Sequence, residues 1–196
     1  MPTISLTTFV DFVAVAGPRR VPLVRECKFN NNQPYDPRKD FYKRLRESVV
    51  AFEKGSMTRA QFEDIESWGV AEKKTANFED AVTHYLSWRD SVQGCWSEPV
   101  TGHRVFGELR IRVNPEVGLN ISGQRHSVKL HFKRDNIPAN RMTIIQGLMG
   151  SLANAGVSSI LDIRREAYFS RTDVEGDVNI LLAAEAAAFM AIWNSV

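Results

Sequence analysis

The sequence predicts an α+β protein, with a helical N-terminal half and a C-terminal half built on a small mixed sheet. Two observations support this class. Apolar residues recur at helical spacing up to about residue 92, and after residue 104 they alternate with polar residues in short stretches. The length of 196 residues allows one domain or two small ones. We therefore expect a helical region over 1–92 and an α/β region over 93–196, either as separate units or within one compact domain.

The first predicted helix lies near the N-terminus. Gly17-Pro18 should end this helix, because proline cannot continue a helix interior. The residues that follow are rich in Pro, Arg and Asn, which indicates a loop. The apolar face of the helix is formed by Phe9, Phe12, Val13 and Ala16.

Three further helices are predicted before residue 93. Asp36-Pro37 is typical of a helix start, with aspartate as the N-cap and proline at the first helical position. Gly55 should end that helix. Residues 58–61, Thr-Arg-Ala-Gln, match a capping box that begins a short helix to about residue 68. The last of the three is expected over about 75–92.

The pattern changes to that of β-strands after Gln93-Gly94. Residues 105–113 alternate between apolar and charged side chains, as a half-buried strand does. Val117–Ile121 and Ser127–Lys133 follow as two more strands, joined by a tight turn at Ser122-Gly123-Gln124. Because strands joined by hairpins are antiparallel, these three are expected to form one contiguous meander.

The remainder of the chain predicts a helix, a strand and a final helix. The first helix is expected from about Pro138 to Ala155, and the apolar stretch Ser158–Ile163 should join the sheet as a strand. Residues 165–177 are polar and are predicted as a loop. An alanine-rich helix over about 177–194 should pack closely against the core, since its side chains are small.

Composition excludes several classes of protein. The longest apolar stretches fall well short of the ~20 residues that a membrane span needs, and the N-terminus lacks the basic start of a secretory signal. Cys27 and Cys95 are too few for a disulfide framework and lack the paired spacing of a zinc site. We therefore expect a cytoplasmic protein with reduced cysteines and no membrane contact.

The formal net charge of +2 hides a strongly basic segment. Residues 103–134 carry seven Lys and Arg but only two Asp and Glu. Alternation is expected to gather the cations on one face of adjacent strands, where they would bind the phosphates of DNA or RNA. A solvated charged face is the alternative. The predicted nucleic-acid-binding residues are Arg110, Arg112, Lys129, His131 and Lys133.

From about residue 75 the predicted order of elements is helix, three strands, helix and strand, and this order resembles the PD-(D/E)xK nuclease superfamily. Those nucleases place Pro-Asp or Pro-Glu at the start of the second strand and (D/E)-x-K on the third. Pro115-Glu116 matches the first motif, and Ser127-Val128-Lys129 lies at the second.

The resemblance implies catalytic roles for Glu116 and Lys129. Glu116 would hold a divalent metal, Mg²⁺ if the site is active, and Lys129 would orient the attacking water. Glu79, on the preceding helix, would supply a further metal-ligating oxygen. Ser127 stands where the superfamily has its second acid, so the sequence predicts weak or absent cleavage. If the chain is an enzyme, it is a metal-dependent nuclease.

The sequence thus predicts an intracellular, nucleic-acid-associated protein with a degenerate nuclease-like core. The alternative is a non-enzymatic interaction module that binds a protein partner within a larger assembly. Trp68 and Trp96 in predicted loops suit that alternative, because tryptophan is enriched at interface hot spots. The stretch Val113–Lys133 also resembles a pattern in uncharacterised bacterial proteins, NPE-x-GL followed by KL-x-FK, which implies no function.

Overall fold

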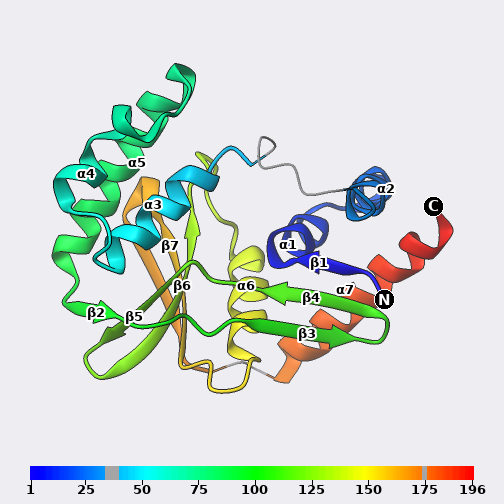
Figure 1. Cartoon of the computed structure of the whole chain (residues 1–196). Helices are drawn as coiled ribbons and strands as arrows, with labels where there is room; N and C mark the ends of the chain where they lie inside the picture. The colour runs from blue at the N-terminus through cyan, green and yellow to red at the C-terminus, as the bar shows by residue number, and fades with distance from the viewer. Residues whose placement is uncertain (34–39, 174–175) are drawn as a thin grey trace.

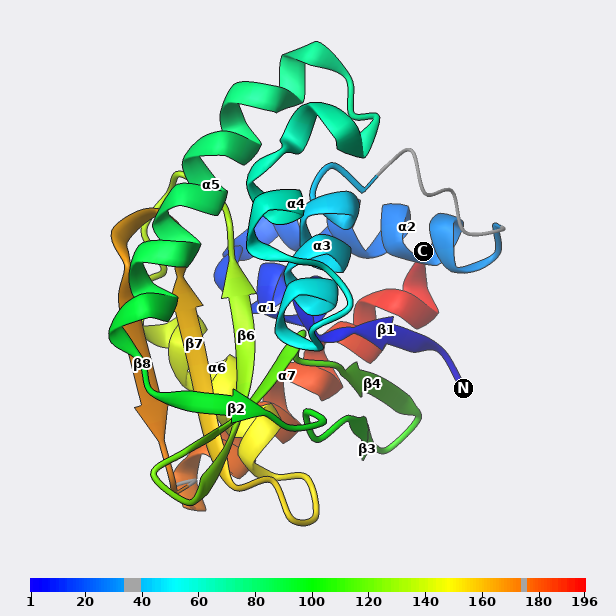
Figure 2. The ribbon, with the colours of Figure 1, turned by 60° about the vertical axis from the view of Figure 1, so that its left-hand side comes forward.

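A computed structural model describes residues 1–33, 40–173 and 176–196. The chain mixes helix and sheet, which confirms the predicted α+β class. A five-stranded sheet lies between two helical layers (Figures 1 and 2). One layer contains α3 (Lys43–Glu53), α4 (Arg59–Glu63) and α5 (Glu72–Ser91). The other contains α6 (Ala139–Gly150), against which α1 (Leu6–Ala14) and α7 (Gly176–Ser195) pack.

The five-stranded sheet has the order β2-β5-β6-β7-β8. Its strands are β2 (Gly94–Trp96), β5 (Val117–Ile121), β6 (Gln124–His131), β7 (Val157–Asp162) and β8 (Ala167–Arg171). Neighbouring strands are antiparallel except β6 and β7, which are parallel because the chain crosses over through α6. The structure confirms the predicted hairpin of the second and third strands and the predicted addition of a strand after α6.

Residues 102–113 form a separate hairpin, so the predicted three-strand meander is wrong in its first member. β3 (Gly102–Phe106) and β4 (Leu109–Val113) are antiparallel, and β4 also pairs in parallel with β1 (Thr3–Ser5). Gly107 turns the chain between β3 and β4 with φ of +56°, in the left-handed region that favours glycine. This turn divides the single strand expected over 105–113 between β3 and β4. The strand that pairs with β5 in place of the expected one is β2.

Two stretches predicted as loops are regular elements. The residues after Ala16 form a 3₁₀ turn (Gly17–Arg19) and then α2 (Arg20–Asn31), in which Val24 is the buried residue. Phe29 of α2 is 64% exposed, so the apolar residues of this helix do not gather on one face and give no clear helical periodicity. Within the stretch 165–177, Ala167–Arg171 is the edge strand β8. The predicted helix start at Asp36-Pro37 lies outside the described residues.

The capping box predicted at residues 58–61 is present at the start of α4. The Thr58 hydroxyl accepts from the Gln61 backbone N–H at 3.3 Å, and the Gln61 side chain accepts from the Thr58 N–H at 2.9 Å. The expected helix to residue 68 is interrupted at Asp64, and a 3₁₀ turn (Ile65–Trp68) completes it. The local sequence therefore fixes where this segment begins.

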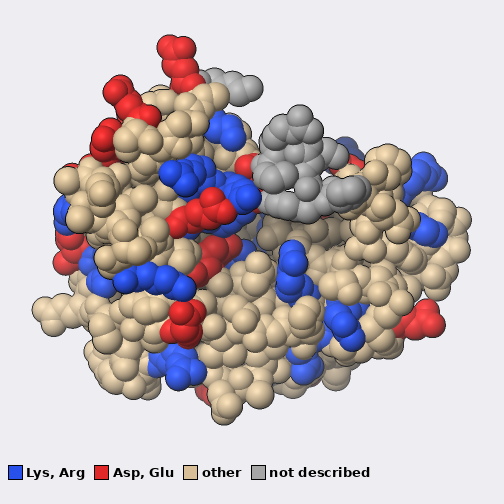
Figure 3. All heavy atoms as spheres, viewed as in Figure 1, with Lys and Arg blue, Asp and Glu red and all other residues tan. Residues whose placement is uncertain are grey.

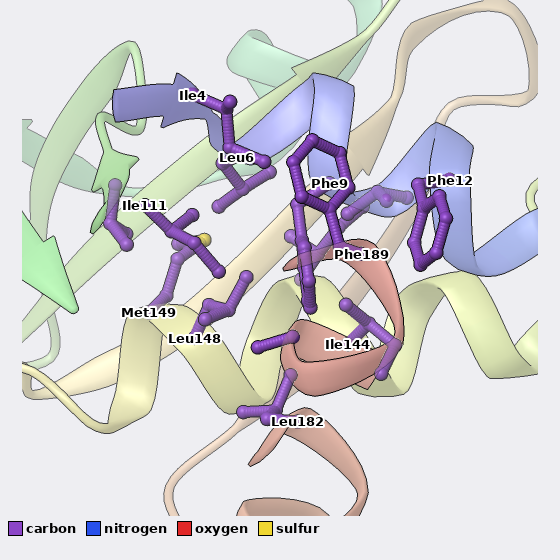
Figure 4. Close-up of a cluster of buried hydrophobic side chains, with 14 of the residues drawn as sticks. Ile4, Leu6, Phe9, Phe12, Ile111, Ile144, Leu148, Met149, Leu182 and Phe189 are labelled. Atoms are coloured by element: carbon purple, nitrogen blue, oxygen red, sulfur yellow. The ribbon is translucent and has the colours of Figure 1, made fainter. Parts of the chain in front are cut away.

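Two hydrophobic cores hold the layers together. One joins α1, α2, α6, α7 and β4, and Phe12 and Phe189 meet edge-on within it at 5.1 Å between ring centroids (Figure 4). The other joins α3, α4 and α5 to β5, β6 and β7. Each core takes residues from both sides of residue 92, so the predicted regions 1–92 and 93–196 share their interiors.

Helix α7 is the one helix among the described residues that is long and apolar enough to cross a membrane by length and composition. One side of it is nevertheless part of a core, as expected for a packing helix. Its buried residues are Val178, Leu182, Ala186 and Phe189.

Gly118 in β5 leads to a first testable prediction. A Cβ at this position would lie 2.1 Å from the Ser97 carbonyl oxygen and 2.5 Å from the Pro99 nitrogen. Because both obstacles are backbone atoms, Gly118→Ala should lower the free energy of unfolding by about 3 kcal/mol. Urea unfolding measures the change. Gly102→Ala is the matched control, since its Cβ would meet the flexible side chain of Leu152 at 3.1 Å. Equal effects of the two substitutions would contradict the prediction.

Candidate functional site

Glu116 and Lys129, the two predicted catalytic residues, are in contact. Glu116 directly precedes β5, and Lys129 lies opposite it on β6, next to the paired residues Val117 and Val128. The Lys129 ammonium donates to one Glu116 carboxylate oxygen. The backbone N–H of Leu130 donates to the other at 2.9 Å. Only 10% of the Glu116 side chain and 13% of the Lys129 side chain are exposed, so this is a nearly buried ion pair.

The surroundings of Glu116 are a poor metal site. Both of its carboxylate oxygens already accept hydrogen bonds. Ser127, which stands in place of a second acid, is buried, and its hydroxyl accepts from the Val100 backbone N–H at 2.9 Å. Within residues 1–33, 40–173 and 176–196, no three His, Cys, Asp or Glu side chains lie close enough together to hold a metal ion. The Glu116–Lys129 pair therefore offers a metal ion a single carboxylate, whose charge the Lys129 ammonium already neutralises.

Glu79, the other predicted metal ligand, lies away from Glu116. It is exposed on α5 and lines a groove with Arg59, Glu63 and Asp90. Helix α5 packs on one face of the five-stranded sheet, whereas Glu116 borders a cleft shared with α1 and α6 on the other. The two carboxylates therefore cannot share a metal, and the sheet between them is the physical reason.

The predicted basic face is divided between two sheets. Arg110 and Arg112 are exposed on β4 of the three-stranded sheet. Lys129 and His131 belong to β6 of the five-stranded sheet, and Lys133 follows it. Alternation predicts which side of one strand a residue takes, but not which sheet the strand joins. On the face shown in Figure 3, Lys and Arg are interspersed with Asp and Glu.

A cleft of about 240 Å³ opens beside the Glu116–Lys129 pair. We call it the charged cleft. Its walls come from α1, α6, the end of β6 and the residues at the start of α3. Its charged lining residues and its one lining histidine are Asp11, Asp40, Arg46, Glu116, Lys129, His131, Lys133 and Arg141. Arg46 and Asp40 form an ion pair at its edge.

Apolar side chains complete the walls of the charged cleft. Leu6 and Val10 are contributed by α1, and Ile145 by α6. Tyr42 and Phe132 stack at 5.2 Å between ring centroids and form another part of the wall. Apolar walls of this kind strengthen the interactions of the more buried charged groups with a ligand, although the Lys133 side chain is 51% exposed.

Two cations in the charged cleft are incompletely paired. The Lys133 ammonium and the Arg141 guanidinium both approach one oxygen of Asp11, at 3.8 and 3.5 Å. These separations exceed those of normal charge-assisted hydrogen bonds. Beyond these contacts with Asp11, neither side chain donates a hydrogen bond to any described residue, and Nε of Arg141 is buried without a partner. The cleft therefore contains donors that an anion could satisfy.

His131, at the end of β6, also lines the charged cleft. Burial lowers its pKa, and the charges of Lys133 and Arg141 act in the same direction, while a hydrogen bond to the Asp135 backbone and the charge of Asp162 oppose them. Its Nε2 is 2.9 Å from the Asp135 carbonyl oxygen and must donate to it. The lowered pKa favours the neutral imidazole, and in that form Nδ1 is an acceptor.

Several residues of the charged cleft had no assigned role in the sequence predictions. Asp11, Asp40, Arg46 and Arg141 come from elements distant in the chain, so no local motif joins them. Asp11 carried one signal, because it interrupts the apolar stretch Phe9–Ala16, most of which lies in α1.

The two tryptophans singled out for a partner contact are not exposed loop residues. Trp68 is buried, and its indole N–H donates to the Gln61 carbonyl at 3.0 Å. Trp96 is half-buried in β2, with the Lys54 ammonium 5.1 Å from its ring centroid. Neither provides the open aromatic surface of an interface hot spot.

No protein-family model matches this chain, and no curated protein matches it at a significant level. A function for this chain must therefore be inferred from the geometry of the Glu116–Lys129 pair and the chemistry of the charged cleft.

Proposed function

We propose that this chain is a nucleic-acid-associated protein whose nuclease-like core binds nucleic acid without metal-dependent cleavage. The order of elements supports a nuclease-like core. α5, β2, β5, β6, α6 and β7 follow one another as αβββαβ, with the β3–β4 hairpin inserted between the first and second strands. Pro115-Glu116 directly precedes the second of these strands, and Lys129 is on the third.

The observation that argues against metal-dependent cleavage is that both carboxylate oxygens of Glu116 already accept hydrogen bonds. A hard cation such as Mg²⁺ needs several oxygen ligands and negative charge. At this position it would have to displace the Lys129 ammonium and the Leu130 N–H from the carboxylate. Ser127 brings no charge to replace the missing acid.

The charge of the cleft supports binding of a polyanion. Its lining has four Lys and Arg and three Asp and Glu. Two of the acids are each paired with one cation, Asp40 with Arg46 and Glu116 with Lys129. The surplus positive charge therefore lies at Lys133 and Arg141, which share Asp11. These two residues are the phosphate-binding groups of the proposed function.

A combined binding and cleavage assay tests the proposal. Labelled single-stranded and duplex DNA and RNA should bind at low salt and stay intact with Mg²⁺ or Mn²⁺. Lys133→Ala should reduce the slope of log affinity against log salt by roughly one unit, because one phosphate contact is lost. Arg110→Ala, which removes an equal charge from the other sheet, should leave the slope unchanged. Robust cleavage that Glu116→Ala abolishes, or no binding at low salt, would overturn the proposal.

An interaction module is the second candidate, and the outer side of α7 favours it. Ile180 is 71% exposed and Leu181 is 42% exposed, beside exposed alanines of the same helix. Exposed apolar surface of this kind is typical of protein contacts. The assay above separates the candidates, since a module of this kind needs no affinity for nucleic acid.

A further inference from the structure

We propose that the charged cleft binds one terminal phosphate group through Lys133 and Arg141, so that the protein recognises the phosphorylated end of a nucleic-acid strand. This inference rests on the proposed function and names the part of the nucleic acid that enters the cleft. It concerns the end of a strand, as opposed to the phosphodiesters within it.

The first support is the convergence of two donors from different elements. Lys133 follows β6, Arg141 lies in the first turn of α6, and both approach the same Asp11 oxygen. Their long separations from that oxygen, 3.8 and 3.5 Å, leave their N–H groups available. A phosphate has three terminal oxygens and can accept from an ammonium and a guanidinium together. It would also give the buried Nε of Arg141 an acceptor.

The start of α6 adds to the same positive potential. Pro138 is the N-cap and makes no side-chain cap hydrogen bond, and the first turn has no acidic residue. Within that turn the Arg141 backbone N–H donates to Asn140 Oδ1 at 2.8 Å. The partial positive charge of a helix N-terminus stabilises an anion placed there. This effect is secondary to the two side chains, but it acts at the same position, because Arg141 belongs to that first turn.

The charge balance favours a terminal phosphate over an internal one. A phosphomonoester carries between one and two negative charges at pH 7, whereas a phosphodiester carries one. Two cations face it in the cleft, and Asp11 opposes it. The Asp11 side chain is 35% exposed, so its carboxylate can turn towards solvent when the phosphate enters.

The size of the charged cleft agrees with this assignment. A volume of about 240 Å³ holds a phosphate with part of its sugar and is too small for a duplex. Leu6, Val10 and Ile145 line the cleft and would contact the apolar part of the sugar. A strand end can enter such a space, whereas an internal phosphate would bring its neighbours on both sides.

Fluorescence anisotropy with short oligonucleotides tests the inference. We expect an oligonucleotide with a 5′- or 3′-phosphate to bind at least tenfold more tightly than the same oligonucleotide with hydroxyl ends. Lys133→Ala combined with Arg141→Gln should remove this difference. Arg44→Ala combined with Arg110→Ala is the matched control, because both are exposed cations outside the cleft, and it should preserve the difference. Asp11→Asn should tighten binding of the phosphorylated strand only.

The outcomes separate this inference from the proposed function. Equal affinity with and without a terminal phosphate would overturn the inference alone. No binding of any oligonucleotide would overturn the proposed function as well. Inorganic phosphate or a nucleoside monophosphate that binds as tightly as the phosphorylated strand would make a small phosphate compound the ligand, and so would overturn recognition of a strand end. Thermal melting checks the fold of each variant, and Asp11→Asn keeps the test decisive if the double variant unfolds.

Discussion

Replacing Glu53 with alanine should lower the free energy of unfolding by about 3–5 kcal/mol, because the substitution leaves a partly buried Arg89 guanidinium without its counter-ion. Only 2% of the Glu53 side chain is exposed. Its carboxylate accepts from Arg89 Nε at 2.8 and 3.1 Å and from the Tyr85 hydroxyl at 2.7 Å. Arg89 also donates to the carbonyls of Val92 and Gly94, both at 2.7 Å. The cluster therefore ties α3 and α5 to the start of β2.

Urea unfolding of matched variants measures this effect. Glu63→Ala is the control, because Glu63 pairs with Arg59 on the surface, where such pairs contribute about 1 kcal/mol or less. Glu53→Gln should cost less than Glu53→Ala, since an amide oxygen still accepts from Tyr85. If Glu53→Ala and Glu63→Ala were equally mild, the cluster would not stabilise the fold as described.

Lys129→Ala should destabilise the protein by about 3 kcal/mol, because it leaves the Glu116 carboxylate nearly buried without its counter-ion. Glu116→Gln should cost a similar amount, because it leaves the nearly buried Lys129 ammonium without its counter-ion. Combining Glu116→Gln with Lys129→Ala should cost less than the sum of the two single variants by at least about 1 kcal/mol, because neither charge is then left alone. A double-mutant cycle in urea unfolding gives this coupling energy.

Additive effects in that cycle would contradict the pairing on which the absence of cleavage depends. They would mean that Glu116 is free of Lys129 in solution and open to a metal. Lys129→Ala also has a chemical readout. If Lys129 is what keeps Mn²⁺ from Glu116, this variant should bind Mn²⁺ more tightly than the wild type, and an isothermal titration measures the change.

The parts of the fold that were predictable are those set by local sequence. The capping box at residues 58–61 fixes the start of α4, and the turn at Ser122-Gly123 fixes the β5–β6 hairpin. The choice of strand partners was not predictable in the same way. Residues 94–96 and 109–113 both form strands, and only tertiary packing decides that β2 joins β5 while β4 joins β1.

The candidate site, too, was predictable from sequence only in its local part. The spacing of Pro115-Glu116 and Lys129 on adjacent strands predicted two residues that the structure brings into contact. The charged cleft around them depends on α1 and α6, which meet β6 only after folding. Asp11 and Arg141 are separated by 130 positions of sequence, so no motif could join them. Alternation likewise could not show that Arg110 and Lys129 belong to different sheets.

Hydrogen–deuterium exchange with and without a bound oligonucleotide is the most direct test of the central claim that nucleic acid binds at the charged cleft. We expect slower exchange at the end of β6, at the start of α6 and in α1, with no change in the β3–β4 hairpin that carries Arg110 and Arg112. Slower exchange confined to the β3–β4 hairpin, with the charged cleft unaffected, would contradict the claim.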